Sequence, residues 1–332
     1  MSNMNIVPLN PKLFDKDVEQ VPIRKGFGEG LVIAGEQNHQ VVALCADLTE
    51  STQMHLFVKK FRERFIQTGI TEQSMASVAS GMAALGKVPF FSSYAMFSPG
   101  RNWEQIRTTI AYNNANCKIV GSHAGVSVGP DGGTHQAIED IALMRVIPRM
   151  VVLSPCDAIE AKKATLAAAQ WHGPVYLRLA REATPIITTE ETPFTIGKAE
   201  LFMTPEGSGA AQVALLATGS LVVNAMKAAQ ALKGKGIKVK VLNFATIKPL
   251  DEEALLAVAE ETGAIVTIEE HQIHGGFGSA VAEYLARTRP TKQEFIGVKD
   301  LFGQSGTPAE LIEHYEMGVT HIIAAAERVI AR

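Results

Sequence analysis

Glu72 is the one acidic residue in a stretch of small and apolar residues. Positions 68–83 read Thr-Gly-Ile-Thr-Glu-Gln-Ser-Met-Ala-Ser-Val-Ala-Ser-Gly-Met-Ala, with apolar side chains at helical spacing. We expect a buried helix, which would place Glu72 against protein instead of bulk water. A carboxyl group there either complements the positive end of the helix dipole or exchanges a proton with a heteroaromatic ring.

A glycine-rich loop with a histidine at each end is the second chemical feature. It runs from His123 to His135 and reads His-Ala-Gly-Val-Ser-Val-Gly-Pro-Asp-Gly-Gly-Thr-His. Glycines let the backbone approach a ligand closely, and the two imidazoles with Asp131 can bond hydroxyl groups or move protons near neutral pH. The alternative interpretation is a solvent-exposed turn.

Short β-branched runs alternate with helical patterns along the chain, which predicts parallel sheets built from right-handed crossovers. We therefore expect an α/β fold with two domains, each a mostly parallel sheet flanked by helices. The expected strands are 41–46, 64–67, 88–91, 118–122, 150–154 and 174–179 in the first block, and 213–218, 237–243, 264–269 and 294–298 in the second. The clearest helical patterns of the second block are 220–233, 251–261 and 279–287.

The expected organisation has four parts. Residues 1–21 form an extended arm, 22–185 the first domain, 186–197 a linker without helical period, and 198–332 the second domain.

Parallel sheets bind ligands beyond the carboxyl ends of their strands, and the polar residues of the first block follow those ends. Asp47, Glu72, His123 and Arg181 each come after an expected strand, and Phe91 with Tyr94 ends another. Acids, aromatic rings and cations on one edge indicate a planar cofactor and an anionic substrate. Ordinary polar turn composition is the competing explanation.

The composition is that of a globular chain with no bias toward nucleic acid. The 332 residues carry a net charge of −3 and are 46% hydrophobic, without an apolar run of membrane-spanning length or a secretory leader pattern. We expect a cytoplasmic protein with reduced thiols at Cys45, Cys117 and Cys156. No metal-ligand spacing occurs, and we interpret His271 and His274 as loop residues.

Taken together, these residues resemble the carboxyl-terminal half of a transketolase, from about residue 24 to the end of the chain. The resemblance rests on several short motifs: Ala-Asp47-Leu-Thr-Glu-Ser51, Gly-Ile-Thr-Glu72-Gln, Phe91 with Tyr94, Trp103-Glu-Gln-Ile-Arg, the His123–His135 loop with its Gly-Gly-Thr-His-Gln ending, and Leu179-Ala-Arg181.

The resemblance implies thiamine diphosphate chemistry, with a pyrimidine-binding domain followed by a transketolase C-terminal domain. Glu72 would hydrogen-bond a ring nitrogen of the aminopyrimidine and thereby activate the cofactor. Phe91 would stack on that ring, with Tyr94 and Asp47 close to it. Asp131 and His135 would contact the oxygens of a ketose donor as catalytic groups.

Four further residues, Arg24, Ser51, His123 and Arg181, fall where the family grips a sugar phosphate. Arg24 and Arg181 also offer fork-shaped donors that suit a phosphate, whereas we interpret Arg178 as a surface salt-bridge residue.

Two features of the family pattern differ in this chain. Ala124-Gly125 replaces the acid that usually follows the first histidine of the loop, and the segment 96–101 is longer than in single-chain transketolases. Moreover, no Gly-Asp-Gly followed by a downstream Asn is present to hold a diphosphate through Mg²⁺.

We therefore expect a split enzyme. A separate N-terminal transketolase subunit with the Gly-Asp-Gly motif would hold the diphosphate and Mg²⁺, this chain would bind no metal itself, and two such pairs would form a heterotetramer acting on sugar phosphates, as in the pentose phosphate route. Alternatives are a 2-oxo-acid dehydrogenase beta-type subunit, a deoxyxylulose-phosphate-synthase-like subunit, and a non-catalytic interaction subunit.

Overall fold

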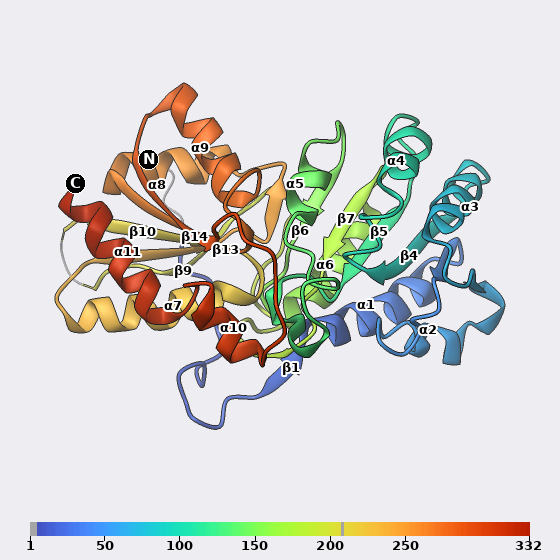
Figure 1. Cartoon of the computed structure of the whole chain (residues 1–332), viewed down its shortest axis with the longest axis horizontal. Coiled ribbons are helices and arrows are strands. Elements are labelled where there is room, and N and C mark those ends of the chain that lie inside the picture. The colour runs from blue at the N-terminus through green and yellow to red at the C-terminus, as the bar shows by residue number, and fades with distance from the viewer. Residues whose placement is uncertain (1–4, 207–208) are drawn as a thin grey trace.

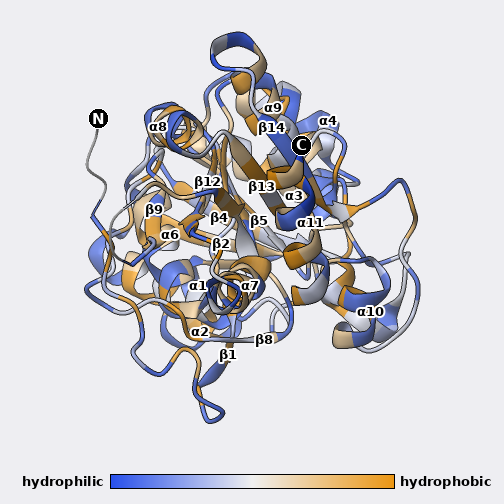
Figure 2. Cartoon of the chain, turned by 90° about the vertical axis from the view of Figure 1, so that its left-hand side faces the viewer, coloured by the Kyte–Doolittle hydropathy of each residue, from blue (hydrophilic) through white to orange (hydrophobic). Residues whose placement is uncertain are grey.

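The computed structural model describes residues 5–206 and 209–332. Within them the chain forms two large sheets that lie side by side, each with helices on both faces (Figure 1). The sheet built mainly from the first half of the chain lies on the right of that view, and the sheet of the second half lies on the left. Figure 2 shows the hydrophobic strands at the centre, enclosed by helices of mixed polarity. This is the expected fold class.

The first sheet contains seven strands in the order β12-β6-β7-β5-β4-β2-β3. All neighbours pair in parallel except β12, which runs antiparallel to β6. The strands are β2 (Val41–Cys45), β3 (Phe65–Gln67), β4 (Val88–Tyr94), β5 (Lys118–Ser122), β6 (Val151–Leu153), β7 (Val175–Arg178) and β12 (Thr246–Lys248).

Helices α1 (Ile23–Gln37) and α6 (Ala158–Gln170) cover one face of this sheet, with α2 (His55–Lys60) and the short turn η1 (Arg62–Arg64) at its end. A side chain at Gly26 would meet the Ala158 carbonyl oxygen at 1.8 Å, so α1 and α6 can pack this closely only with glycine there. The other face carries α3 (Glu72–Ala84), α4 (Trp103–Gln105), the π-helical turn η2 (Ile106–Ala111) and α5 (Asp140–Arg145).

The second sheet contains five strands in the order β14-β13-β10-β11-β9. Its strands are β9 (Glu200–Met203), β10 (Val213–Ala217), β11 (Val239–Asn243), β13 (Ala264–Gln272) and β14 (Lys292–Val298). Helices α7 (Val222–Gly234), preceded by η4 (Gly219–Leu221), and α11 (Val319–Ala331) pack on one face, and α8 (Glu252–Thr262) and α9 (Phe277–Thr288) on the other. The helix α10 (Pro308–His314) packs against the turn η3 (Val126–Asp131).

Every strand expected from the sequence is present, with ends shifted by a few residues. Four short strands were not expected: β9, β12, and the antiparallel pair β1 (Gln20–Pro22) and β8 (Ala183–Pro185). They have three or four residues each. His271, expected in a loop, lies in β13 and is fully buried.

The helix α3 is less buried than its sequence suggested. Met75 and Ala79 are buried, as expected, but Val78 is 44% exposed and the following Leu85 is 84% exposed. The reason is that α3 packs on β4, β2 and η2 with one side only.

In the described part of the chain, no helix is long and apolar enough to cross a bilayer.

Candidate active site

The carboxyl ends of β2, β3, β4, β5 and β7 meet on one edge of the first sheet, because these strands are all parallel. The residues that follow them therefore come from distant parts of the sequence to one region, as the sequence predicted.

Glu72 is the first residue of α3, and its carboxylate is withdrawn from solvent. The residue is 2% exposed. The Ser93 hydroxyl donates to its Oε1 at 3.1 Å, and Arg101 Nη1 donates to its Oε2 at 3.0 Å. The Asn102 amide donates to the Glu72 backbone carbonyl at 3.1 Å, which ties the start of α3 to the turn after β4. The carboxylate thus has a fixed position and two donors.

Four rings, from Tyr94, Phe97, His123 and His135, form a group that includes the turn after β4. Tyr94 stacks on His123 with ring centroids 3.9 Å apart and on Phe97 with centroids 6.2 Å apart. His135 approaches Phe97 edge-on at 5.4 Å and Tyr94 at 6.4 Å. The two histidines at the ends of the glycine-rich loop therefore meet the same pair of rings. Arg101, which contacts both Phe97 and Glu72, connects this group of rings to the carboxylate.

Arg24 and Arg181 bring two positive charges next to these rings. Arg24 Nη1 donates to the Arg181 carbonyl at 2.6 Å, and Arg181 donates to the Val128 carbonyl. Burial, and then repulsion from Arg181, lower the pKa of Arg24. The Nε of Arg24 is buried without a hydrogen-bond partner among the described residues. Two adjacent guanidinium groups with a spare donor are well suited to an anion.

The same charges act on His123, which is 3% exposed. Burial, followed by the positive charges of Arg24 and Arg181, lowers the pKa of His123 to about 3. The ring is therefore neutral near pH 7, and its Nδ1 shares a hydrogen bond with the Ser122 hydroxyl at 2.9 Å. Asp131 is exposed and lies 3.8 Å from Arg181.

Among the described residues, three of those expected at the site make no hydrogen bond, ion pair or ring contact with this group. Phe91 is fully buried in the core under the sheet, so no face of its ring is open to a ligand. Asp47 is exposed, and its backbone amide donates to the Gln67 side chain at 2.8 Å. Ser51 is half-buried, and among the described residues no hydrogen bond or ion pair joins its side chain to the others.

Sequence reasoning missed Ser93, Phe97 and Arg101. The signal for Phe97 was its spacing of three residues after Tyr94 within a turn, which repeats an aromatic residue on one side of the chain. Ser93 and Arg101 carried no such signal, because they reach Glu72 across 21 and 29 residues.

Comparison with known families decides the affiliation of the chain. Residues 19–186 match the transketolase pyrimidine-binding domain, and residues 206–322 match the transketolase C-terminal domain. The chain belongs to the transketolase family.

Its relatives include chains of similar length. A Methanocaldococcus jannaschii protein, provisionally named a transketolase C-terminal section, is 44% identical over 88% of this chain and 91% of its own length. A 6-deoxy-6-sulfo-D-fructose transketolase subunit from a Clostridium species is 38% identical over 96% of this chain and 98% of its own. A solved structure titled as a split gene transketolase in an inactive beta4 tetramer superposes with a TM-score of 0.86, at 40% identity, over 94% of this chain and 99% of that one.

Glu270 of β13 supports the loop 123–135 through a hydrogen bond. The Ser127 amide donates to Glu270 Oε1 at 2.6 Å, and the Ser220 hydroxyl donates to Oε2 at 2.6 Å. Gly125 has a φ of 90°, and a side chain there would meet Glu270 Oε1 at 2.3 Å. Ala124 is fully buried in a small cluster with Ala95 and Ala137. The Ala124-Gly125 pair thus fits a loop packed tightly on both sides.

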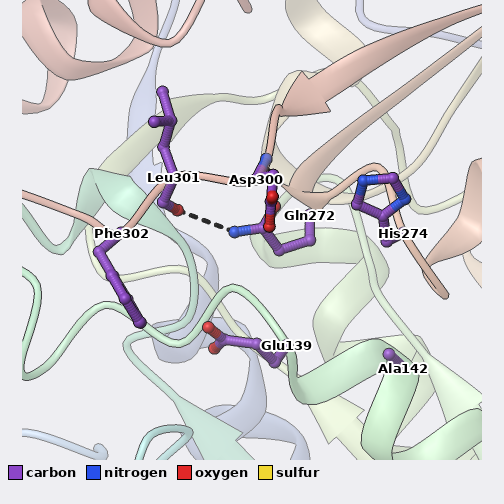
Figure 3. Close-up of a pocket in the computed structure, with 7 residues that line it drawn as sticks. All are labelled: Glu139, Ala142, Gln272, His274, Asp300, Leu301 and Phe302. Carbon is purple, nitrogen blue, oxygen red and sulfur yellow. Dashed lines mark hydrogen bonds between the residues drawn. The ribbon is translucent and has the colours of Figure 1, made fainter.

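A pocket of about 330 Å³ lies between the start of α5, the end of β13 and the segment after β14 (Figure 3). It is lined by Glu139, Ala142, Gln272, His274, Asp300, Leu301 and Phe302. The Gln272 amide donates to the Leu301 carbonyl at 2.8 Å and closes one wall.

In the described part of the chain, no group of three or more His, Cys, Asp or Glu residues could hold a metal ion.

Arg178 is not the surface salt-bridge residue expected from the sequence. It is 5% exposed, and its Nε donates to Asp140 Oδ2 at 2.8 Å while its Nη2 donates to the Glu270 carbonyl at 2.7 Å. Because β7 alternates its side chains between two faces, Arg178 points into the junction of the two sheets and Arg181, beyond the strand end, reaches the site.

Proposed function

We propose that this chain is the C-terminal subunit of a two-chain, thiamine-diphosphate-dependent transketolase, which transfers a two-carbon ketol unit between sugar phosphates. The observation that carries the proposal is the buried Glu72 carboxylate beside the turn that bears Phe97, in a chain of the transketolase family. In this proposal residues 22–185 and 198–332 act as the pyrimidine-binding and C-terminal domains, 1–21 as an arm and 186–197 as the linker between them.

The residues present fit the aminopyrimidine half of such a cofactor. A flat ring needs a stacking face and one carboxylate in its plane, and Phe97 and Glu72, which Arg101 contacts together, offer these. When bound, thiamine diphosphate supplies a carbon nucleophile that adds to the carbonyl of the ketose donor. We assign the stacking face to Phe97, flanked by Tyr94, in place of Phe91.

Within the proposal each residue has a definite task. Glu72 exchanges a proton at a ring nitrogen while Ser93 keeps its Oε1 in position. Asp131 and His135 bond oxygens of the ketose, and neutral His123 bonds a hydroxyl group. Arg24 and Arg181 hold the phosphate. Asp47 and Ser51 remain proposed contacts at the end of β2.

The need for a second subunit is also part of the proposal. One relative is named a transketolase subunit, and the related split gene transketolase is titled inactive as a beta4 tetramer. We propose that an N-terminal subunit with a Gly-Asp-Gly motif holds the diphosphate and Mg²⁺, that two pairs form a heterotetramer, and that the complex works in the cytoplasm.

The test is reconstitution with the N-terminal subunit. The pair should transfer ketol units between ketose and aldose phosphates, and this chain alone should not. Glu72→Gln should lower kcat by about 10²- to 10⁴-fold, since proton transfer at the ring is lost. The exposed Glu63→Gln serves as the matched control and should keep full activity.

The outcomes separate the alternatives. Activity of this chain without a partner would refute the split enzyme, and an unchanged rate in Glu72→Gln would refute the mechanism. Turnover of pyruvate, instead of ketose phosphates, would identify a deoxyxylulose-phosphate-synthase-like or 2-oxo-acid dehydrogenase type of subunit. Assembly without thiamine diphosphate binding would leave a non-catalytic interaction subunit.

A further inference from the structure

Arg101, whose side chain is half exposed, makes an ion pair with the buried carboxylate of Glu72. Its Nη1 lies 3.0 Å from Glu72 Oε2, and the two side chains are 51% and 2% exposed, respectively. The arginine therefore covers the carboxylate from outside. The contact neutralises a buried charge that would otherwise lack a cation.

The guanidinium group is also stacked on an aromatic ring. Its central carbon lies 4.4 Å from the centroid of Phe97. The backbone of the turn is fixed independently of this side chain, because the Arg101 amide donates to the Phe97 carbonyl at 2.9 Å and Asn102 bonds both Ser98 and the Glu72 carbonyl. The side chain can swing into water without disturbing the turn.

The two contacts of Arg101 are those that the proposed function requires of the aminopyrimidine. A planar, nitrogen-bearing group lies on Phe97 and donates to the carboxylate of Glu72. The Arg101 guanidinium and the aminopyrimidine therefore cannot lie on the same face of Phe97 and bond the same oxygen of Glu72 at the same time.

We propose that Arg101 is a built-in place-holder for the cofactor ring: it keeps Glu72 paired in the subunit before loading, and it leaves when the aminopyrimidine binds. This inference rests on the proposed function and adds a gating residue to it. Cofactor binding then includes the cost of displacing Arg101, so the apparent affinity equals the intrinsic affinity multiplied by the fraction of molecules in which Arg101 has left the site.

The test is calorimetric titration of thiamine diphosphate with Mg²⁺ into the reconstituted complex. Arg101→Gln should bind the cofactor roughly three- to tenfold more tightly than the natural chain, because an ion pair of this exposure is lost on binding. Arg107→Gln, an exposed arginine one helical segment further on, is the matched control and should leave the affinity unchanged.

A double-mutant cycle shows whether the effect passes through Glu72. In the Glu72→Gln background, Arg101→Gln should give a smaller gain in affinity, because only its stacking on Phe97 is then removed. Without cofactor, Arg101→Gln should lower the thermal midpoint of the complex, and saturating cofactor should remove that difference. Neither the calorimetric affinity nor the thermal midpoint depends on turnover.

Equal or weaker binding by Arg101→Gln would overturn the place-holder, and so would a gain that is undiminished in the Glu72→Gln background. In either case binding by the natural complex would leave the proposed function intact. No binding by the natural complex would overturn both.

Discussion

At the residue scale, burial determines the charge of His123, which lies at the edge of the first sheet where its parallel strands end. His123 lies under Tyr94 and beside Arg24 and Arg181, which are all on different elements. A positive imidazole there would lose its hydration and meet two like charges. His123 is therefore a neutral hydrogen-bonding group across the physiological range, and its role in the proposed site is to bond a substrate hydroxyl.

This state of His123 makes the folded chain sensitive to acid. Its pKa is about 3 when folded and near 6.5 when unfolded, so between these values the unfolded chain binds a proton that the folded chain refuses. The contribution to stability is complete above pH 6.5 and is lost as the pH falls toward 3. His123→Gln should therefore show a shallower loss of unfolding free energy between pH 6.5 and 4, measured by urea denaturation.

The exposed His39→Gln is the control for that titration and should reproduce the slope of the natural chain. The same slope in His123→Gln would mean that this histidine takes up its proton freely in the folded protein.

At the element scale, the loop 123–135 has a fixed position because β13 and the segment between β14 and α10 support it. Glu270 fills the space that a side chain at position 125 would need, and the Gln136 amide donates to the Gln304 carbonyl at 2.9 Å on the other side of the loop. The second half of the chain thus positions the histidines and Asp131, although it contributes none of the proposed catalytic groups.

Gly125→Ala tests this support. The backbone at position 125 has φ 90° and ψ 177°, a region that side chains avoid, and the added methyl group would press on Glu270. We expect the free energy of unfolding to fall by roughly 1–3 kcal/mol. Gly234→Ala, at the open end of α7 with nothing within 4 Å of the added carbon, should change it little. Equal effects of the two changes, by urea denaturation, would contradict a tightly packed loop.

At the scale of the whole molecule, the two sheets are joined by more than a linker. Strand β12 leaves the second block and pairs with β6 of the first sheet, and the arm near Val7 bonds to Leu201 of β9. Arg178 of β7 connects Asp140 to the Glu270 carbonyl at the centre of the junction. The hydrophobic core is continuous from Leu44 and Met75 to Leu216 and Phe277.

Arg178→Leu should therefore destabilise the molecule as a unit. It leaves the Asp140 carboxylate buried without its cation, which costs on the order of 3–5 kcal/mol. Denaturant unfolding should keep a single transition at a lower midpoint. Arg62→Leu, at an exposed position, is the control and should shift the midpoint little. Two separate transitions in the natural chain, or a loss below about 1 kcal/mol in Arg178→Leu, would contradict a shared junction.

The sequence alone determined ten of the strands, that most of them are parallel, that Tyr94 lies at a strand end, and that Glu72, His123 and Arg181 follow strand ends. These properties are local, because a buried strand and its terminating polar residue are adjacent in the chain. Only the tertiary structure decided that Phe97 contacts Tyr94 and His135 while Phe91 is in the core, that Arg178 is buried, and that Arg101 covers Glu72. Each of these depends on which distant segment packs alongside, and a contact across 29 residues leaves no periodic trace in the sequence.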